Sequence, residues 1–459
     1  MTTKLHISYR QIILLSLPLI LGSAGQNIIA LSDSIFLFYK SKEDFAAIGF
    51  IGVFYLVITA IGYGFSKGGQ ILIARRMGEG KPEEVGRNFF DMLYFELILA
   101  LLMFLFMRFG CPHFFKLFVK SKVIYDKSLI FLRYRAWGVF FSYAGLALIS
   151  MYTGVARTRF ILIDTLILGI LNLMLCYVLV FGKFGMPDMG IGGAALASSI
   201  AEMVAFICFV IYIFFDKKAD IYHLFTPRKL HFHTIREQMT ISIPSVVQPV
   251  VGLGSWFVFF SYVENYLGVT ELAVTNLVRL LYLFLSIPSW GFASSVNTLV
   301  GNVMGQRHFD NVVPTIWKTA KLCLIVTLAL AIPILLFPMQ ILEPLFRRTG
   351  EIDLLHDAQP MFGVLLIILM LFSIGSVFFN ALAGLGAAFF GLLLQFVGAV
   401  FYLVFIHIIL TYTTGGLPWA WSAEIFYWII ILGATLLYLK THRWKKKFTA
   451  KLTSTTNVS

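Results

Sequence analysis

The sequence predicts an all-α integral membrane protein with twelve transmembrane helices, and three observations lead to this prediction. Hydrophobic residues make up 59% of the 459-residue chain and charged residues 13%, against about 25% charge in an average soluble domain. Apolar runs long enough to cross a bilayer follow one another along the chain. The second half of the chain repeats motifs of the first. Together these observations exclude an ordinary soluble enzyme.

Each expected helix is an apolar run of about 20 residues or more, bounded by charged or turn-forming residues. The first run, 11–38, is too long for the apolar core of a signal peptide and no A-x-A cleavage pattern follows it, so we expect it to be the first spanning helix. The other runs cover residues 45–73, 90–110, 136–156, 160–182, 191–215, 238–263, 273–300, 316–338, 359–384, 388–412 and 417–439.

The runs and their connections predict four parts of the chain. We expect an N-terminal lobe over residues 1–220, a cytoplasmic linker over 221–237, a C-terminal lobe over 238–440 and a basic cytoplasmic tail over 441–459.

The net charge of +13 does not indicate nucleic-acid binding here, because the cations gather in short connections and in the tail. With the N-terminus inside, the inner connections carry twenty Lys and Arg and the outer ones twelve. This asymmetry predicts a multi-pass protein of the plasma (inner) membrane with both termini in the cytoplasm. The segment 108–135 is the exception, since it places seven cations on the expected outer side.

No metal or disulfide site is expected. The cysteines show no CxxC spacing, and His231 and His233 alone do not close a metal site. The four cysteines are Cys111, Cys176, Cys208 and Cys323.

The internal repeat is the clearest organisational signal. Leu15-Ser16-Leu17-Pro18 returns as Ile241-Ser242-Ile243-Pro244, an offset of 226 residues. The following helix returns at an offset of 227, with seven identical residues that include the pair Gly64-Phe65 and Gly291-Phe292. An even number of helices in each copy makes both copies enter the membrane in the same direction, so we expect a symmetry axis along the membrane normal. A substrate path between the two lobes follows from this expectation.

These motifs, in this order and duplication, resemble those of the multidrug and toxic compound extrusion (MATE) transporters. The resemblance covers nearly the whole chain, and it implies two pseudo-symmetric six-helix bundles that form a V-shaped central cavity. It also implies drug export driven by an inward flow of H⁺ or Na⁺. The residues that carry it are Pro18, Ser32-Asp33-Ser34, Ala46-Ala47-Ile48-Gly49, Gly64-Phe65, Arg75-Arg76-Met77-Gly78-Glu79-Gly80, Gly291-Phe292 and Val300-Gly301-Asn302-Val303-Met304-Gly305.

Asp33 is the first candidate for the cation-coupling site. It lies five residues before the end of the first run, about 7 Å below the outer membrane boundary. A poorly hydrated carboxylate at this depth can take a proton from outside and release it when the site changes shape. In the resembling family, the acidic residue at this place carries the coupling cation. The alternative is an aspartate at the helix end that is exposed to water or caps a neighbouring helix.

Asn172 and Cys176 extend this candidate site, because residues four apart share one face of a helix. They resemble a family pattern of Asn followed four residues later by Asp, with Cys176 in the place of Asp. A hard cation needs several oxygen ligands, for which a thiol is a poor substitute. The sequence therefore favours H⁺ over Na⁺ as the coupling ion and implies no other cofactor.

Ser198 and Glu202 lie one turn apart near the middle of the sixth run. Ser198 stands at a family Ser/Thr position that hydrogen-bonds within the same pocket. We expect Asp33, Asn172, Ser198 and Glu202 to form a polar network in which Glu202 compensates for Cys176. The alternative is a structural, permanently protonated glutamate.

The second half lacks the acid of the first. The position related to Asp33 falls at Phe259 or Phe260, and neither 238–263 nor 361–412 contains an acid. The NorM-like branch of the family uses carboxylates there, so the chain looks more like the DinF-like branch. Polar residues that remain as candidates for the cavity are Gln248, Asn276, Arg279 and Asn380.

The leading hypothesis is a cation-coupled antiporter that exports lipophilic, cationic drugs or toxic compounds by alternating access. It takes a small-molecule substrate within the lipid bilayer, binds no nucleic acid and acts as a monomer. The alternatives are a flippase for a lipid-linked saccharide from the same superfamily and an uncoupled MATE-like transporter. We expect no enzyme, because no HExxH, GxSxG or paired-His motif is present.

Overall fold

The computed structural model describes residues 4–5, 7–119, 121–226, 231–344, 352–413 and 415–445, without the side chains of residues 26–28, 30–31, 118, 218 and 269. Most of the expected basic tail, residues 446–459, lies outside the described residues. Within these ranges every regular element is a helix, and no strand is present. The all-α prediction is therefore confirmed.

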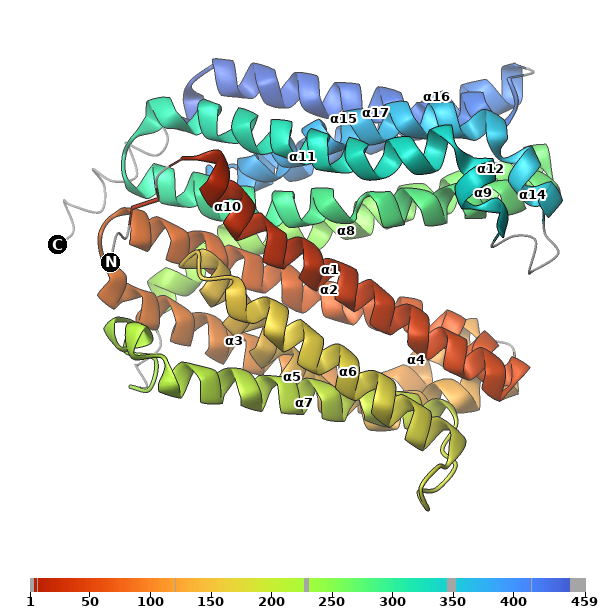
Figure 1. Cartoon of the computed structure of the whole chain (residues 1–459), viewed down its shortest axis with the longest axis horizontal. Helices are drawn as coiled ribbons and strands as arrows, with labels where there is room; N and C mark the ends of the chain where they lie inside the picture. Colours follow the sequence, from red (N-terminus) through yellow and green to blue (C-terminus); the bar gives the residue numbers. More distant parts are fainter. Residues whose placement is uncertain are drawn as a thin grey trace. The chain divides into compact units, whose positions relative to one another are not determined.

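The first half of the chain forms six long helices, joined or extended by short ones (Figure 1). The long helices are α1 (Tyr9–Lys40), α2 (Lys42–Gly78), α3 (Val85–Leu105), α5 (Lys122–Gly154), α6 (Arg159–Phe181) and α7 (Ile191–Phe215). The short elements are η1 (Pro82–Glu84), η2 (Phe106–Gly110), α4 (Cys111–Phe118) and η3 (Lys217–Tyr222).

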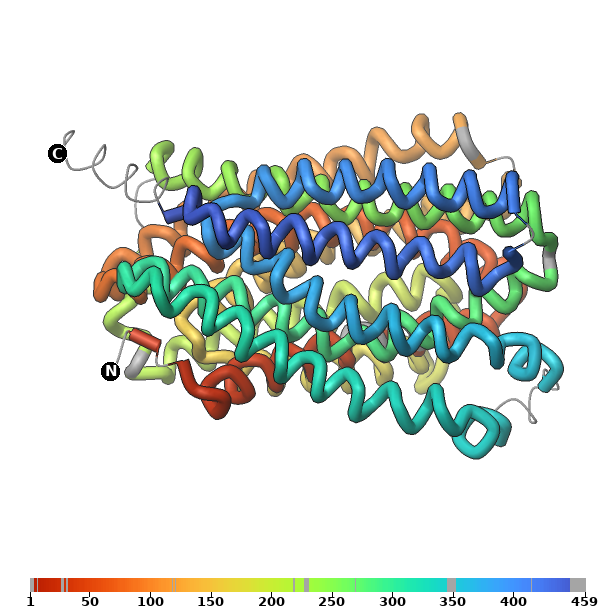
Figure 2. The backbone as a smooth tube through the Cα atoms, turned by 90° about the horizontal axis from the view of Figure 1, so that it is seen from above, coloured from red at the N-terminus to blue at the C-terminus, as the bar shows by residue number. Residues whose placement is uncertain are grey.

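The second half repeats this pattern, and its trace can be followed in Figure 2. Its long helices are α8 (Phe232–Leu267), α9 (Val269–Leu285), α10 (Ile287–Gly305), α11 (Val312–Leu336), α15 (Gln359–Gly384), α16 (Ala388–Tyr412) and α17 (Gly416–Lys440). The short elements are η4 (Phe309–Asn311), α12 (Pro338–Ile341) and α14 (Ile352–Asp357).

The predicted membrane spans agree with these helices. In the described part of the chain, ten helices are long and apolar enough to cross a membrane, and the bent pair α9 and α10 makes eleven. Helix α1 has 32 residues and is about 48 Å long, more than the roughly 30 Å of a bilayer core. Each of the twelve predicted runs thus coincides with one helix or with consecutive helices.

The contacts divide the described chain into two units. Leu17–Val246 belong to unit 1, whereas Leu5–Ser16 and the residues from 247 onward belong to unit 2. The division therefore falls inside α1 and inside α8, and the described part of the expected linker 221–237 groups with unit 1. The expected domain boundaries were set at polar connections, which do not show where a long helix changes its packing partners.

The fourth predicted run begins too late in the sequence. It was expected from residue 136, but α5 already begins at Lys122, with Ser121 accepting a hydrogen bond from the Ile124 N–H as its N-cap. The charged residues in the first half of α5 interrupt the apolar run, and such an interruption is typical of a connecting loop. In the structure Lys127 pairs with Asp44 of α2 at 2.6 Å, so charges within this helix have partners in unit 1.

The eighth predicted run is bent. Helices α9 and α10 meet at Ser286 with a bend of 43°. Pro288 lies in the first turn of α10, where a proline is tolerated because the backbone N–H there has no helical partner. The repeat places Ile61 at the corresponding position in the continuous helix α2, so the proline distinguishes the two copies.

Candidate functional site

Three helices of unit 1 bring a chain of polar side chains together. The Asn172 side-chain amide on α6 donates to the Ser198 hydroxyl on α7 at 2.9 Å, and this hydroxyl donates to Oδ2 of Asp33 on α1 at 3.2 Å. The buried Cys176 thiol lies beside the same carboxylate. The structure thus places four of the predicted site residues in one cluster.

A close approach of α6 and α7 makes this cluster possible. Gly193 on α7 faces the backbone of Leu179 on α6, and an added Cβ would lie 2.6 Å from the Leu179 carbonyl atoms. Only glycine allows the two backbones to come so near. Asn172 and Ser198 then reach each other across the gap, although both side chains are short.

The Asp33 carboxylate keeps one oxygen available. Among the described residues, no hydrogen bond reaches the buried Asp33 Oδ1 or the buried Asn172 Oδ1. A buried acceptor without a donor is costly, and a proton or a cation bound at this place removes that cost. Two buried oxygen atoms, Asp33 Oδ1 and Asn172 Oδ1, thus lie in this cluster without a hydrogen-bond donor among the described residues.

Glu202 lies one turn beyond Ser198 on α7, but it pairs with a different residue. Arg135 of α5 donates from Nη1 to Oε2 at 2.6 Å and from Nη2 to Oε1 at 2.5 Å. This two-fold arrangement is the strongest geometry available to an Arg–carboxylate pair. Arg135 also interacts electrostatically with Asp33, so Glu202 is linked to the cluster through a cation rather than by direct contact.

Sequence reasoning missed Arg135, because the residue was assigned to the connection before residue 136. The side chain of Arg135 is 9% exposed, and its guanidinium lies 4.2 Å from the centre of the Tyr55 ring. Gly138 allows α5 and α7 to lie close together, since an added Cβ there would lie 2.5 Å from the Ser199 hydroxyl of α7. A signal was present in the sequence, namely the unusual cluster of cations on the expected outer side.

The polar residues proposed for unit 2 do not form one cluster in the structure. The Gln395 amide donates to the Gln248 carbonyl oxygen at 2.8 Å, and the Arg279 guanidinium lies 5.3 Å from the Phe260 ring centre. Asn276 and Asn380 each donate to the carbonyl oxygen four residues earlier in their own helices. In the part of the chain that the structure describes, these contacts do not join the four predicted residues into one site.

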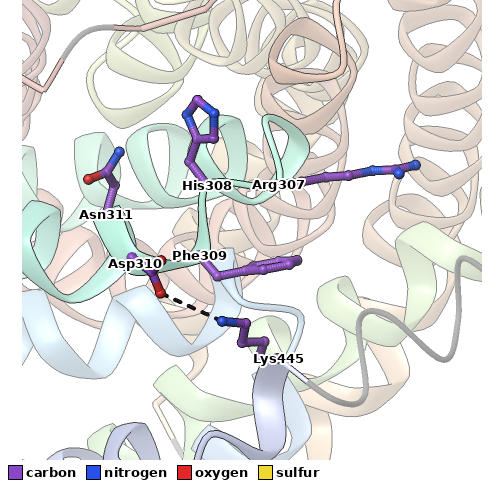
Figure 3. Close-up of a pocket in the computed structure, with 6 residues that line it drawn as sticks. All are labelled: Arg307, His308, Phe309, Asp310, Asn311 and Lys445. Atoms are coloured by element: carbon purple, nitrogen blue, oxygen red, sulfur yellow. Dashed lines mark ion pairs between the residues drawn. The ribbon is translucent and has the colours of Figure 1, made fainter.

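Unit 2 also has a surface pocket, which contains none of the predicted site residues (Figure 3). It lies at η4 and the end of α17, and Lys445 pairs there with Asp310 at 3.6 Å. Its lining is polar and of mixed charge, which does not suit a lipophilic ligand. The lining residues are Arg307, His308, Phe309, Asp310, Asn311 and Lys445.

Comparison with known proteins agrees with the fold and the repeat. A "Probable multidrug resistance protein NorM" from Thermotoga maritima is 22% identical over 442 residues, which cover 95% of this chain and 93% of the relative. The protein of the same name from Synechocystis is 24% identical over 338 residues, or 72% of each chain.

Solved structures show the same fold. An outward-facing MATE family transporter of the MOP superfamily superposes with a TM-score of 0.84 at 20% identity, covering 96% of both chains. A MOP superfamily transporter from Pyrococcus furiosus, described as having a binding pocket of reverse polarity, has a TM-score of 0.85 at 20% identity and covers 95% of both chains.

The family model named MatE matches the chain twice, over residues 18–178 and 244–413. The two matches correspond to the two copies of the internal repeat and together cover more than half of the sequence. The chain therefore belongs to the MatE family of multidrug and toxic compound extrusion transporters.

Proposed function

We propose that the protein is an H⁺-coupled antiporter that exports lipophilic, cationic compounds by alternating access, with Asp33 as the coupling residue. The observation that carries the proposal is the hydrogen-bonded chain from Asn172 through Ser198 to Asp33. It holds a carboxylate inside a membrane-spanning helix with one oxygen free, and an ionisable residue in this position is by default a functional one.

The residues around Asp33 have separate tasks in this proposal. Ser198 donates to the charged carboxylate and stabilises it after the proton has left. Asn172 orients the Ser198 hydroxyl. The Arg135–Glu202 pair holds α5 against α7 and places a positive field next to Asp33, which favours release of the proton.

The Cys176 thiol supports H⁺ rather than Na⁺ as the coupling ion. A metal cation at Asp33 would find oxygen from Asp33 and Asn172 but sulfur at Cys176, and sulfur is a poor ligand for a hard cation. A proton needs only one carboxylate. The absence of a second carboxylate next to Asp33 in the described cluster is therefore compatible with proton coupling.

The names of the NorM relatives support multidrug substrates, while the location of the site in unit 1 favours a mechanism of the DinF-like branch. We further propose that the protein acts as a monomer in the plasma membrane with both termini in the cytoplasm. Four of the seven cations in 108–135 lie within helix α5 and therefore do not count as loop charges. Fewer cations on the outer side support the proposed orientation.

The test is efflux of ethidium, a lipophilic cation, from proteoliposomes that contain the purified protein. Asp33→Asn should abolish the response to an imposed pH gradient, and a Na⁺ gradient alone should drive no efflux. Glu264→Gln is the matched control, because Glu264 is an exposed carboxylate on α8. Unchanged pH-driven efflux in Asp33→Asn would remove Asp33 as the coupling site.

A further inference from the structure

Unit 2 contains a buried carboxylate that has no role in the function proposed above. Glu424 lies in the apolar helix α17 and is 5% exposed. The Trp256 indole N–H of α8 donates to Glu424 Oε1 at 2.7 Å. The Tyr402 hydroxyl of α16 faces the same carboxylate. Three helices of unit 2 thus meet at Glu424, as three helices of unit 1 meet at Asp33.

The repeat places Glu424 at the position of Ser198. Gly190 before α7 and Gly416 at the start of α17 both have a positive φ, 51° and 49°, and they are 226 residues apart. This is the offset of the proline motif in α1 and α8. Counting eight residues onward from each glycine leads to Ser198 in unit 1 and to Glu424 in unit 2.

A second pair of turns places Tyr402 at the position of Asn172. Ala156 and Gly386 occupy the turns before α6 and α16, both with positive φ, at an offset of 230. Sixteen residues onward from each lie Asn172 and Tyr402. The Asn172–Ser198 contact of unit 1 therefore corresponds to the Tyr402–Glu424 contact of unit 2.

The third position, that of Asp33, is taken by Phe259, as the offset of 226 requires. Its ring lies 6.2 Å from Tyr402 and 5.5 Å from Trp421, measured between centroids. Unit 2 thus holds the same three-helix arrangement, but the carboxylate has moved from the first helix of the copy to the last.

The surroundings of Glu424 provide no compensating positive charge. In the part of the chain that the structure describes, no Lys, Arg or His lies within ion-pair distance of it. The titratable groups that face it are all tyrosines, and α15, which packs against α17, has no charged residue or histidine between 359 and 384. These tyrosines are Tyr282 on α9, Tyr402 on α16 and Tyr427 on α17.

We propose that Glu424 is a second proton-binding site of the protein, which takes up and releases a proton separately from Asp33. A buried carboxylate without a cation is costly in a medium of low dielectric constant, and a proton neutralises it. When the proton leaves, the Trp256 N–H and the Tyr402 O–H stabilise the charge by hydrogen bonds. Among the described residues, Glu424 belongs to no group of three or more His, Cys, Asp or Glu that could hold a metal ion, so the proton is the ligand of this site.

Trp256 provides a direct readout, because its indole N–H is bonded to the group that titrates. The experiment is a pH titration of tryptophan fluorescence on the purified full-length wild type and on Glu424→Gln. We expect a fluorescence change with pH in the wild type that is absent in Glu424→Gln. The fluorescence should still titrate in Asp33→Asn and in the exposed control Glu264→Gln.

Infrared spectroscopy of the carboxyl stretch gives a second measurement that does not depend on tryptophan. One protonated-carboxyl band should disappear in Glu424→Gln at all pH values. If that variant does not fold, Tyr402→Phe, which keeps the carboxyl but removes a donor to its charged form, should move the midpoint of the same band to higher pH. A tryptophan fluorescence that does not titrate in the wild type, or a fluorescence change that persists in Glu424→Gln, would overturn the proposal.

The participation of Glu424 in transport rests on the function proposed above, but its proton binding does not. If coupling uses both sites, Glu424→Gln should lower the number of protons moved per ethidium molecule while Asp33→Asn abolishes coupling. Failure of the Asp33 test with a persisting Glu424 titration would refute only the function proposed above. The reverse result would refute only the second proton site.

Discussion

Arg135 holds the Glu202 carboxylate with two hydrogen bonds, one from each terminal nitrogen of its guanidinium group. The pair joins α5 to α7 inside unit 1, and both partners are largely shielded from solvent. Removal of either partner would therefore leave the other as an unpaired charge inside unit 1.

The first prediction concerns this pair. Arg135→Leu should destabilise the protein by about 3–5 kcal/mol, because it leaves Glu202 charged and buried. The double variant Arg135→Leu with Glu202→Leu should recover most of that loss, since no unpaired charge remains. Thermal unfolding of the purified variants measures both effects, and a double variant less stable than Arg135→Leu would contradict the prediction.

The second prediction concerns the hydroxyl that bonds Asp33. Ser198→Ala removes a hydrogen bond to a charged group, which is worth about 1.5–3 kcal/mol, or roughly a ten- to hundred-fold change in proton affinity. We expect the pH midpoint of ethidium efflux to move to higher pH by about one to two units. Ser198→Thr keeps the hydroxyl and is the control. An efflux profile of Ser198→Ala that coincides with that of the wild type would show that the bond has no functional role.

The third prediction concerns ion selectivity. Cys176→Asp places a second carboxylate beside Asp33 and supplies the oxygen ligands that a hard cation needs. We expect this variant to show efflux driven by a Na⁺ gradient, which the wild type lacks. Cys176→Ser controls for the loss of the thiol. Equal Na⁺ responses of the two variants would mean that selectivity is determined elsewhere.

The long helices were predictable from the sequence because hydrophobic run length is a direct physical requirement of a bilayer. The start of α5 was not, because a charge such as that of Arg135 marks the end of a span only when it is hydrated. Here Glu202 replaces water as its partner, and this partner is distant in the sequence. The bend before Pro288 was also missed, since an apolar run does not reveal its curvature.

Part of the candidate site was predictable for a similar reason. Asn172 and Cys176 share a helical face by spacing alone, and Asp33 is conspicuous as an acid in an apolar helix. Glu424 was overlooked although it also lies in an apolar run. The residue that corresponds to Asp33 in the second copy is Phe259, whereas the structure places the carboxylate on a different helix of the repeated arrangement.

The last prediction tests the close approach that assembles the Asp33 cluster. Gly193→Ala adds a Cβ 2.6 Å from the backbone of Leu179, so α6 and α7 must separate. We expect a destabilisation of about 1–3 kcal/mol from overpacking. Efflux should also fall, because Asn172 no longer reaches Ser198. Gly145→Ala in α5 is the matched control, since nothing lies within 4 Å of its added Cβ. If the two variants unfold at the same temperature and transport equally well, the spacing of α6 and α7 does not limit the site.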